Sequence, residues 1–326
     1  MDALAALSVR ALIQLDLLLD RAAPDGLIPL EEARTDISQI PTRTAADFTG
    51  EGRAIVVIDD GYSPFYDQSN TVDGNDFFGL SDDPDASVNK RDSHGSWVAQ
   101  TALAVAPDLA ILHFKVLPDF GGNARLPDIE QALDAVFDYA ETWEIAAVNL
   151  SLGLGNEAAP ETTQLTDEIA DLHAAGIATV VAAGNDGARS SDGVSDFAAD
   201  PLAIGVSATT EAGRFAPFSQ RHPELTDIAA LGEDIPVVAL DGETRLLDGT
   251  SFSAPYVTAT IARLQQASEA VNGRPLSVDD VVEIMQTSGA PVSDAQDAPG
   301  YRVLDSDMAV EYFLANSEFY ADPLDG

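Results

Sequence analysis

Short runs of almost wholly apolar residues recur through the middle of the chain, and within them polar residues do not alternate with apolar ones. Such runs are typical of strands that are buried on both faces of a parallel sheet. Between some of them, residues 127–142 and 162–175 repeat apolar positions at helical spacing. Because right-handed crossovers put such helices on both faces of a sheet, the pattern predicts a three-layer α/β fold with a mainly parallel central sheet. The runs span residues 54–58, 109–116, 145–150, 177–182 and 202–206.

The two ends of the chain carry different patterns. Residues 3–22 repeat leucine at roughly helical spacing, which predicts an amphipathic helix, and residues 24–52 are rich in proline and glycine. We therefore divide the chain into an N-terminal extension (1–44), one domain (45–315) and a short acidic tail (316–326). Charged residues interrupt the leucine-rich start, so it predicts neither a signal peptide nor a membrane span.

Acidic residues dominate the charge: 55 Asp and Glu against 16 Lys and Arg give a formal net charge of −39 over 326 residues. This charge disfavours nucleic acid and anionic membranes as partners, and it favours cations and cationic peptides.

The chain has no cysteine, which excludes disulfides, thiolate catalysis and cysteine-bound metals. Its four histidines lie far apart in the sequence, which argues against a histidine-bound zinc. We expect the protein to act as a monomer.

Polar residues follow the predicted strands, at the edge where open parallel sheets hold their sites. Asp59 comes directly after the first run, and Asn185 comes shortly after the fourth. His94 stands among small polar residues just before a helical pattern, and it is the histidine best placed to transfer protons. Taken singly, an Asp or Asn at a strand end is more often a helix cap or a turn residue.

Ser251 stands at the start of another helical pattern, after Gly249 and Thr250. The free N–H groups at a helix N-terminus favour negative charge, so a serine there has an anion site beside it. The plainer interpretation is that Ser251 only caps the helix. The motifs around Asp59, His94 and Asn185 decide between these two interpretations of Ser251.

These candidates occur in the order Asp, His, Asn, Ser, and the stretches that contain them resemble the signature motifs of the subtilisin-like serine peptidases. The resemblance extends over roughly residues 45–315 and comprises six motifs in the family's order and spacing. They are AIVVIDDG (54–61), SHG (93–95), VAP with FKVL (105–107 and 114–117), VNLSLG (148–153), AGNDG (183–187) and GTSFSAP (249–255).

The resemblance implies a serine endopeptidase that works through an acyl-enzyme. It identifies Ser251 as the nucleophile, His94 as the general base and acid, and Asp59 as the carboxylate that holds the imidazole. Asn185 is implied as the side-chain donor to the oxyanion. The substrate is implied to be a peptide or protein segment that binds as an extended strand between two segments. They are Gly121-Gly122-Asn123 and Ser151-Leu152-Gly153.

The chain departs from the family's usual pattern in several places. Ser96 and Trp97 stand where Thr and His are usual, so Trp97 is expected to add bulk near the base. Asp60 stands where Ser or Thr is usual. The triplet Asp-Asp-Gly also occurs in the kexin-like branch, which cleaves after basic residues, although this chain differs from kexins elsewhere.

A loop rich in carboxylates separates Asp59 from His94. Oxygen ligands in a flexible loop suit Ca²⁺, and members of the family commonly hold structural calcium, so we predict a calcium site there. The alternative is a solvated acidic loop in a chain that is acidic throughout. The candidate ligands are Asp73, Asp76, Asp82, Asp83 and Asp85, with Asp67, Asn70 and Asn75 nearby.

Residues 27–30 (LIPL) resemble a short motif of intracellular subtilisins, whose N-terminal extension blocks the active site. The alternative is that this segment only packs on the domain. For the compartment, the acidity, the few lysines and the habits of the resembling family predict export without a leader, and the alternative, favoured by the absence of a signal, is the cytoplasm. Two rival functions remain, a catalytically inactive peptide-binding protein and a protease dedicated to maturing one peptide.

Overall fold

The computed structural model describes most of the predicted domain. The described residues are 44–63, 69–78, 93–118, 122–160, 163–187, 192–292 and 300–321. The helix predicted over residues 3–22 and the motif at 27–30 lie outside them.

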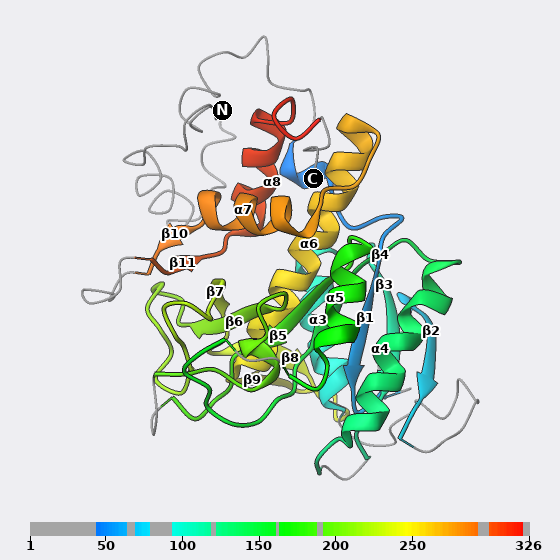
Figure 1. Ribbon diagram of the computed structural model, residues 1–326, viewed down its shortest axis with the longest axis vertical. Helices are drawn as coiled ribbons and strands as arrows, with labels where there is room; N and C mark the ends of the chain where they lie inside the picture. Colours follow the sequence, from blue (N-terminus) through cyan, green and yellow to red (C-terminus); the bar gives the residue numbers. More distant parts are fainter. Residues whose placement is uncertain are drawn as a thin grey trace.

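One large sheet runs through the described residues. Its strands are β1 (Ala54–Asp59), β2 (Thr71–Asp76), β3 (Ala110–Lys115), β4 (Ile145–Leu150), β5 (Ala178–Ala182), β6 (Ile204–Thr209), β7 (Ile228–Leu231), β10 (Ala290–Pro291) and β11 (Arg302–Val303). Their order across the sheet is β10-β11-β7-β6-β5-β4-β1-β3-β2 (Figure 1). Every neighbouring pair is parallel except β10 with β11. The five predicted runs form β1, β3, β4, β5 and β6, which confirms the mainly parallel sheet.

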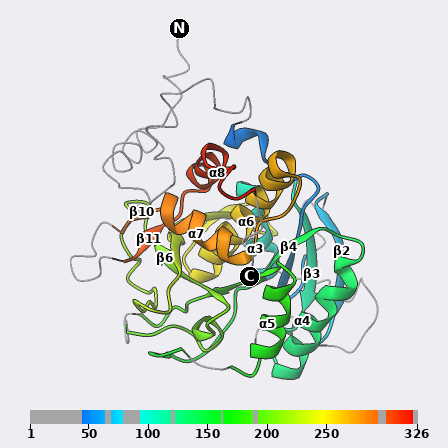
Figure 2. The ribbon, with the colours of Figure 1, turned by 45° about the horizontal axis from the view of Figure 1, so that its top comes forward.

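Helices cover both faces of this sheet (Figures 1 and 2). On one face lie α4 (Leu126–Ala140) and α5 (Thr166–Ala174), and on the other lie α3 (His94–Val105) and α6 (Thr250–Asn272). Strand β1 shows why its sequence does not alternate. Val56 and Ile58 pack in the core beneath α4 and α5, whereas Ile55 and Val57 pack in the core beneath α3 and α6. The three-layer arrangement predicted from the sequence is therefore confirmed.

Several elements had no clear signal in the sequence. β8 (Ile235–Val238) and β9 (Thr244–Leu247) form a separate antiparallel hairpin, and α7 (Val278–Ser288) packs with α8 (Ser306–Ala315). β2 lies within the segment that we interpreted as a loop. The chain beyond α8 also differs from the expected free tail, because Asn316 and Tyr320 are 5% and 2% exposed. None of the helices in the described ranges is long and apolar enough to cross a membrane.

The strand order brings the candidate residues to one edge of the sheet. β1 and β4 are neighbours, and the chain leaves them in opposite directions, from β1 toward β2 and from β4 toward β5. Such a reversal places a crevice at the carboxyl ends of the two strands. Asp59 ends β1, Ser151 follows β4, and Asn185 follows β5. The N-terminus of α6, with Ser251, reaches this same edge, where it is hydrogen-bonded to Ser151 and Asn185.

Candidate active site

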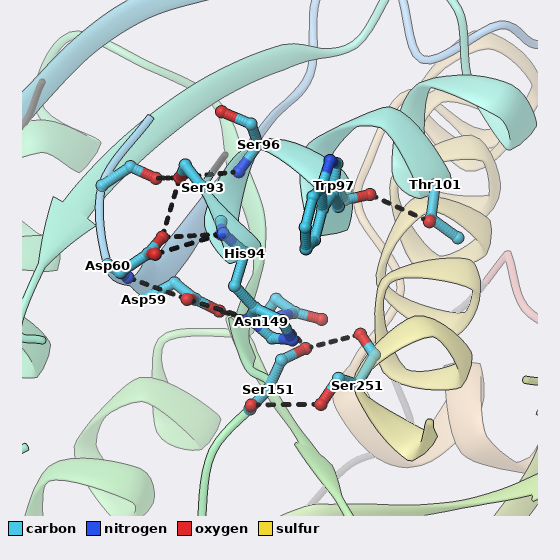
Figure 3. Close-up of polar contacts among 12 residues, drawn as sticks. Asp59, Asp60, Ser93, His94, Ser96, Trp97, Thr101, Asn149, Ser151 and Ser251 are labelled. Atoms are coloured by element: carbon cyan, nitrogen blue, oxygen red, sulfur yellow. Dashed lines mark hydrogen bonds and ion pairs between the residues drawn. The ribbon is translucent and has the colours of Figure 1, made fainter. Parts of the chain in front are cut away.

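His94 is the first residue of α3, and its imidazole faces the carboxylate of Asp59 (Figure 3). Nδ1 of His94 lies 2.8 Å from Oδ2 and 3.0 Å from Oδ1 of Asp59. Asp59 is fully buried, and the main-chain N–H of Asp60 donates to its Oδ1 at 2.8 Å. This contact orients the ring with Nδ1 toward the carboxylate, which leaves Nε2 directed away from it.

The surroundings of His94 favour its cationic form. The atoms packed around the imidazole disfavour the charge, but the Asp59 carboxylate, its hydrogen bond and the Asp60 charge outweigh this and raise the pKa of His94 to about 9. A histidine with a carboxylate partner binds a proton strongly, so it can accept one from a neighbouring hydroxyl.

Ser251 lies in the first turn of α6, next to Ser151 (Figure 3). The hydroxyl of Ser251 donates to the main-chain O of Ser151 at 3.4 Å, and the hydroxyl of Ser151 donates to the main-chain O of Ser251 at 2.8 Å. Asn149 Nδ2 donates to Ser151 Oγ at 2.9 Å, and Thr258 Oγ1 donates to Asn149 Oδ1 at 3.1 Å. A buried chain of polar groups therefore fixes α6 against the end of β4. To act as a nucleophile with His94 as its base, the Ser251 hydroxyl would turn from Ser151 toward His94.

Two N–H donors converge beside Gly249. The Oδ1 of Asn185 accepts from the N–H of Thr250 at 2.9 Å and from its hydroxyl at 3.0 Å. With the oxygen held in this way, the Nδ2 of Asn185 faces the other side. A Cβ placed on Gly249 would lie 3.6 Å from the N of Ser251 and 3.7 Å from Nδ2 of Asn185. One point beside Gly249 thus lies less than 4 Å from both nitrogen atoms, and two donors around one point could stabilise a developing oxyanion.

A cavity of about 200 Å³ opens beside Ser251. Its wall includes Asn185 and three residues predicted to bind substrate, Ser151, Leu152 and Gly153. The predicted residues Gly122 and Asn123 are not among those that line it, and Gly121 lies outside the described residues. The structure therefore brings one of the two predicted substrate-binding segments to the cavity.

Gln220 also lines this cavity, and its side-chain amide is hydrogen-bonded to two other segments of the wall. Its Nε2 donates to Gly155 O at 3.0 Å, and its Oε1 accepts from the N–H of Asp186 at 3.2 Å. Gly184 faces it closely: its φ is +107°, and a Cβ there would lie 2.1 Å from Oε1 of Gln220. Only glycine fits this position, and the close contact keeps the segment that carries Asn185 in place.

Trp97 does add bulk to the first turn of α3, and the hairpin β8–β9 accommodates it. Trp97 packs against Ile235, Val237 and Phe252. The ring of Phe252 lies 5.8 Å from that of His94. The indole therefore forms part of an apolar cluster that supports the hairpin beside the site.

The predicted calcium ligands are only partly described. Asp73 and Asp76 lie on the edge strand β2, and because they are three residues apart they project to opposite faces of that strand. Asp67, Asp82, Asp83 and Asp85 lie outside the described residues. Within the described ranges, no group of three His, Cys, Asp or Glu side chains is placed to hold a metal. Asp73 and Asp76 do not form a site by themselves.

Several residues that shape the site were not predicted from the sequence. Thr250 and Asn149 lie inside the motifs, and the polar side chain of Asn149 inside an apolar run was a signal that could have been used. Gln220 carried no such signal, because its partners come from segments far away in the chain. Asp60 was noticed only as a departure from the family, and its contacts prove to be extensive.

Comparisons with known proteins identify the family and the fold. The profile of the Subtilase family matches residues 50–301. A solved structure described as a cold adapted subtilisin-like serine proteinase superposes with a TM-score of 0.66 at 23% identity, over 89% of this chain and 97% of that one. No curated protein matches the sequence. Since the family profile covers most of the chain, the protein belongs to the subtilase family.

Proposed function

We propose that this protein is a serine endopeptidase that hydrolyses peptide bonds through an acyl-enzyme. The observation that carries the proposal is the meeting of three parts at one edge of the sheet. They are the His94–Asp59 pair at 2.8 Å, the Ser251 hydroxyl at the start of α6, and the two N–H donors that converge beside Gly249. Membership of the subtilase family supports the serine peptidase class.

In the first half of the reaction, Ser251 Oγ attacks the carbonyl carbon of the substrate while Nε2 of His94 takes the hydroxyl proton. Asp59 stabilises the imidazolium and keeps Nδ1 protonated. The carbonyl oxygen gains negative charge in the region between Ser251 N and Asn185 Nδ2. His94 then gives its proton to the leaving amine, and the C–N bond breaks to leave the acyl group on Ser251.

In the second half, a water molecule enters from the side that the amine has left. His94 Nε2 removes a proton from this water as its oxygen attacks the ester carbon. The same two donors stabilise the second oxyanion, and the C–O bond to Ser251 breaks. The proton returns from His94 to Ser251 Oγ, and the carboxylic acid product leaves.

The substrate is proposed to be an extended peptide or protein segment, bound along Ser151-Leu152-Gly153 and Gly122-Asn123. The side chain of the residue that donates the attacked carbonyl enters the cavity of about 200 Å³ beside Ser251. Backbone pairing of this kind tolerates many sequences, so the cavity is the part that selects between side chains.

Ser251→Ala tests the proposal. The variant is expected to lose roughly 10⁶-fold in kcat, a loss of the size known for subtilisin itself, while its circular dichroism spectrum and Tm stay close to those of the parent. The parent is expected to bind a serine-directed phosphonate covalently, with the adduct on Ser251 by peptide mass mapping. Peptide hydrolysis by Ser251→Ala at the parent rate would contradict the assignment.

The same labelling experiment separates the rival functions. An inactive peptide-binding protein would bind substrate peptides without phosphonate adduct or turnover. A protease dedicated to one peptide would react with the phosphonate but cleave few members of a broad peptide library.

A further inference from the structure

Every main-chain N–H in the first turn of α3 has an acceptor, and Asp60 supplies two of them. The N–H of His94 donates to Oδ2 of Asp60 at 3.1 Å, and the N–H of Gly95 donates to Oδ1 at 2.8 Å. The next two N–H groups, of Ser96 and Trp97, donate to the side chain and main-chain oxygens of Ser93 at 3.2 Å each. Helices usually leave these first N–H groups without a protein partner, so this N-terminus is unusually well bound.

These hydrogen bonds of Asp60 connect strand β1, which carries Asp59, with helix α3, which carries His94. Asp60 comes directly after β1 and next to Asp59, whereas its hydrogen-bond donors lie at the start of α3. Ser93 Oγ strengthens the connection by donating to Asp60 Oδ1 at 2.7 Å and to Gly61 O at 2.9 Å (Figure 3). The carboxylate of Asp60 therefore holds the helix that carries His94 to the strand that carries Asp59.

The fit between these segments leaves no room for adjustment. A Cβ placed on Gly95 would lie 2.3 Å from the main-chain O of Gly61 and 3.3 Å from Oδ1 of Asp60. From the other side, Lys115 Nζ of β3 donates to the main-chain O of Asp60 at 2.8 Å. The position of Asp60 is thus fixed by contacts on both sides.

The charge of Asp60 acts on His94 as well. A helix N-terminus by itself disfavours a cationic histidine, and a carboxylate there opposes this effect. Among the described residues, the end of β1 and the residue after it present Asp59 and Asp60 to the imidazole. Behind them β3 carries Lys115 and His113, and α6 presents the uncharged ring of Phe252. Burial, and next the charge of Asp59, raises the pKa of Asp60 itself.

We propose that Asp60 is a positioning residue for the general base: its carboxylate clamps the start of α3 to the end of β1, and its negative charge favours the imidazolium that forms when His94 takes the proton of Ser251. This inference rests on the proposed function and adds a role that Ser or Thr at this position, being uncharged, could not perform. The charge at residue 60 then helps to set the pH at which His94 becomes a competent base.

Two variants separate the charge from the clamp. Asp60→Asn keeps the size and one acceptor oxygen but removes the charge, and Asp60→Ser removes both the charge and the bridge to α3. Asp280→Asn is the matched control, because Asp280 is also a helix-capping carboxylate, at the start of α7. The measurement is the pH profile of kcat/KM on one peptide substrate.

The acid limb of the Asp60→Asn profile is expected to move to lower pH by roughly half a unit to one unit, the size expected for loss of one nearby charge. Asp60→Ser is expected to show the same shift and a further loss of about 10-fold or more in kcat at every pH, because His94 is no longer held in place. Asp280→Asn is expected to leave the profile unchanged.

A uniform loss of activity in Asp60→Asn with no movement of the acid limb would mean that Asp60 only caps α3. This outcome would overturn the proposal. A second measurement does not depend on turnover: the chain has four histidines, so the NMR titration of His94 can be followed in the parent and in both variants, with His94→Gln to assign the signal. An unchanged midpoint overturns the proposal too. Absence of both turnover and phosphonate labelling in the parent would instead contradict the proposed function, whatever the titration shows.

Discussion

Thr250 holds the side-chain oxygen of Asn185 from two sides, with its main-chain N–H at 2.9 Å and its hydroxyl at 3.0 Å. Thr250 is itself 1% exposed, and its Oγ1 also accepts from the N–H of Gly184 at 3.1 Å. These two bonds determine which end of the amide faces the cavity, since an NH₂ group in place of the oxygen could not accept from the main-chain N–H of Thr250. The donor end of Asn185 is therefore fixed before any substrate binds.

Asn185→Ala is expected to lower kcat by about 10² to 10³, the loss known for the equivalent residue in subtilisin, with little change in KM. The reason is that the amide contacts charge that exists only in the transition state. Steady-state kinetics on a short peptide measures this split. An effect mainly on KM would mean that Asn185 binds the ground state of the substrate.

The activity of the parent protein is expected to rise with pH up to about 9. His94 must be neutral to accept a proton, and its pKa is raised to about 9, so kcat/KM should increase as pH rises through that value. The profile of kcat/KM from pH 6 to 10 checks this, with phosphonate labelling rates as an independent readout. A plateau already reached at pH 7 would show that the pKa of His94 in the free protein lies well below 9.

His113 is expected to make the fold sensitive to acid. It is 2% exposed in β3, its ring lies 5.1 Å from that of Tyr62, and burial lowers its pKa to about 4, although the Asp59 charge acts in the opposite direction. A depressed pKa means that the unfolded chain binds the proton first, so stability is full above about pH 6.5 and falls as pH drops toward 4. The loss is on the order of 3 kcal/mol.

Urea unfolding of the parent and of His113→Gln between pH 4 and 8 measures this effect. The difference in unfolding free energy between them should shrink as pH falls, because the variant has no imidazole to protonate. His173→Gln, at the end of α5 beside Asp279, is the control and should keep the pH dependence of the parent. Parallel curves for the parent and His113→Gln would rule out a part for His113.

Calcium is expected to raise Tm, and chelation to lower it. The segment between Asp59 and His94 concentrates carboxylates, and a cation relieves their repulsion and binds only the folded state. NaCl at matched ionic strength is the control, because screening of the net charge of −39 also stabilises the chain. The triple variant Asp82→Asn, Asp83→Asn, Asp85→Asn should lose the calcium response but keep the response to NaCl. If NaCl reproduces the whole gain, the loop is a solvated acidic segment.

The sequence by itself determined the fold class and the main candidates of the site. Strands such as β1 are buried on both faces, and this burial leaves a run of apolar residues that can be recognised without coordinates. Asp59 and Asn185 lie at or shortly after the ends of strands, and His94 and Ser251 lie in the first turns of helices. Their place at one edge of the sheet therefore follows from parallel topology. These features are local in the chain, which is why the pattern of residues is enough to predict them.

Only the tertiary structure decided what depends on contacts between distant segments. β2 lies in a stretch read as a loop, and the hairpin β8–β9 takes up the bulk of Trp97. Gln220 closes a cavity whose other walls come from four separate segments of the chain. The side chain of Asp60 could have faced solvent or substrate, and it caps α3 because the chain, after β2, brings the start of that helix back to the end of β1. Such contacts join residues that are far apart in the sequence and depend on tertiary packing, so the spacing of residues along the chain does not predict them.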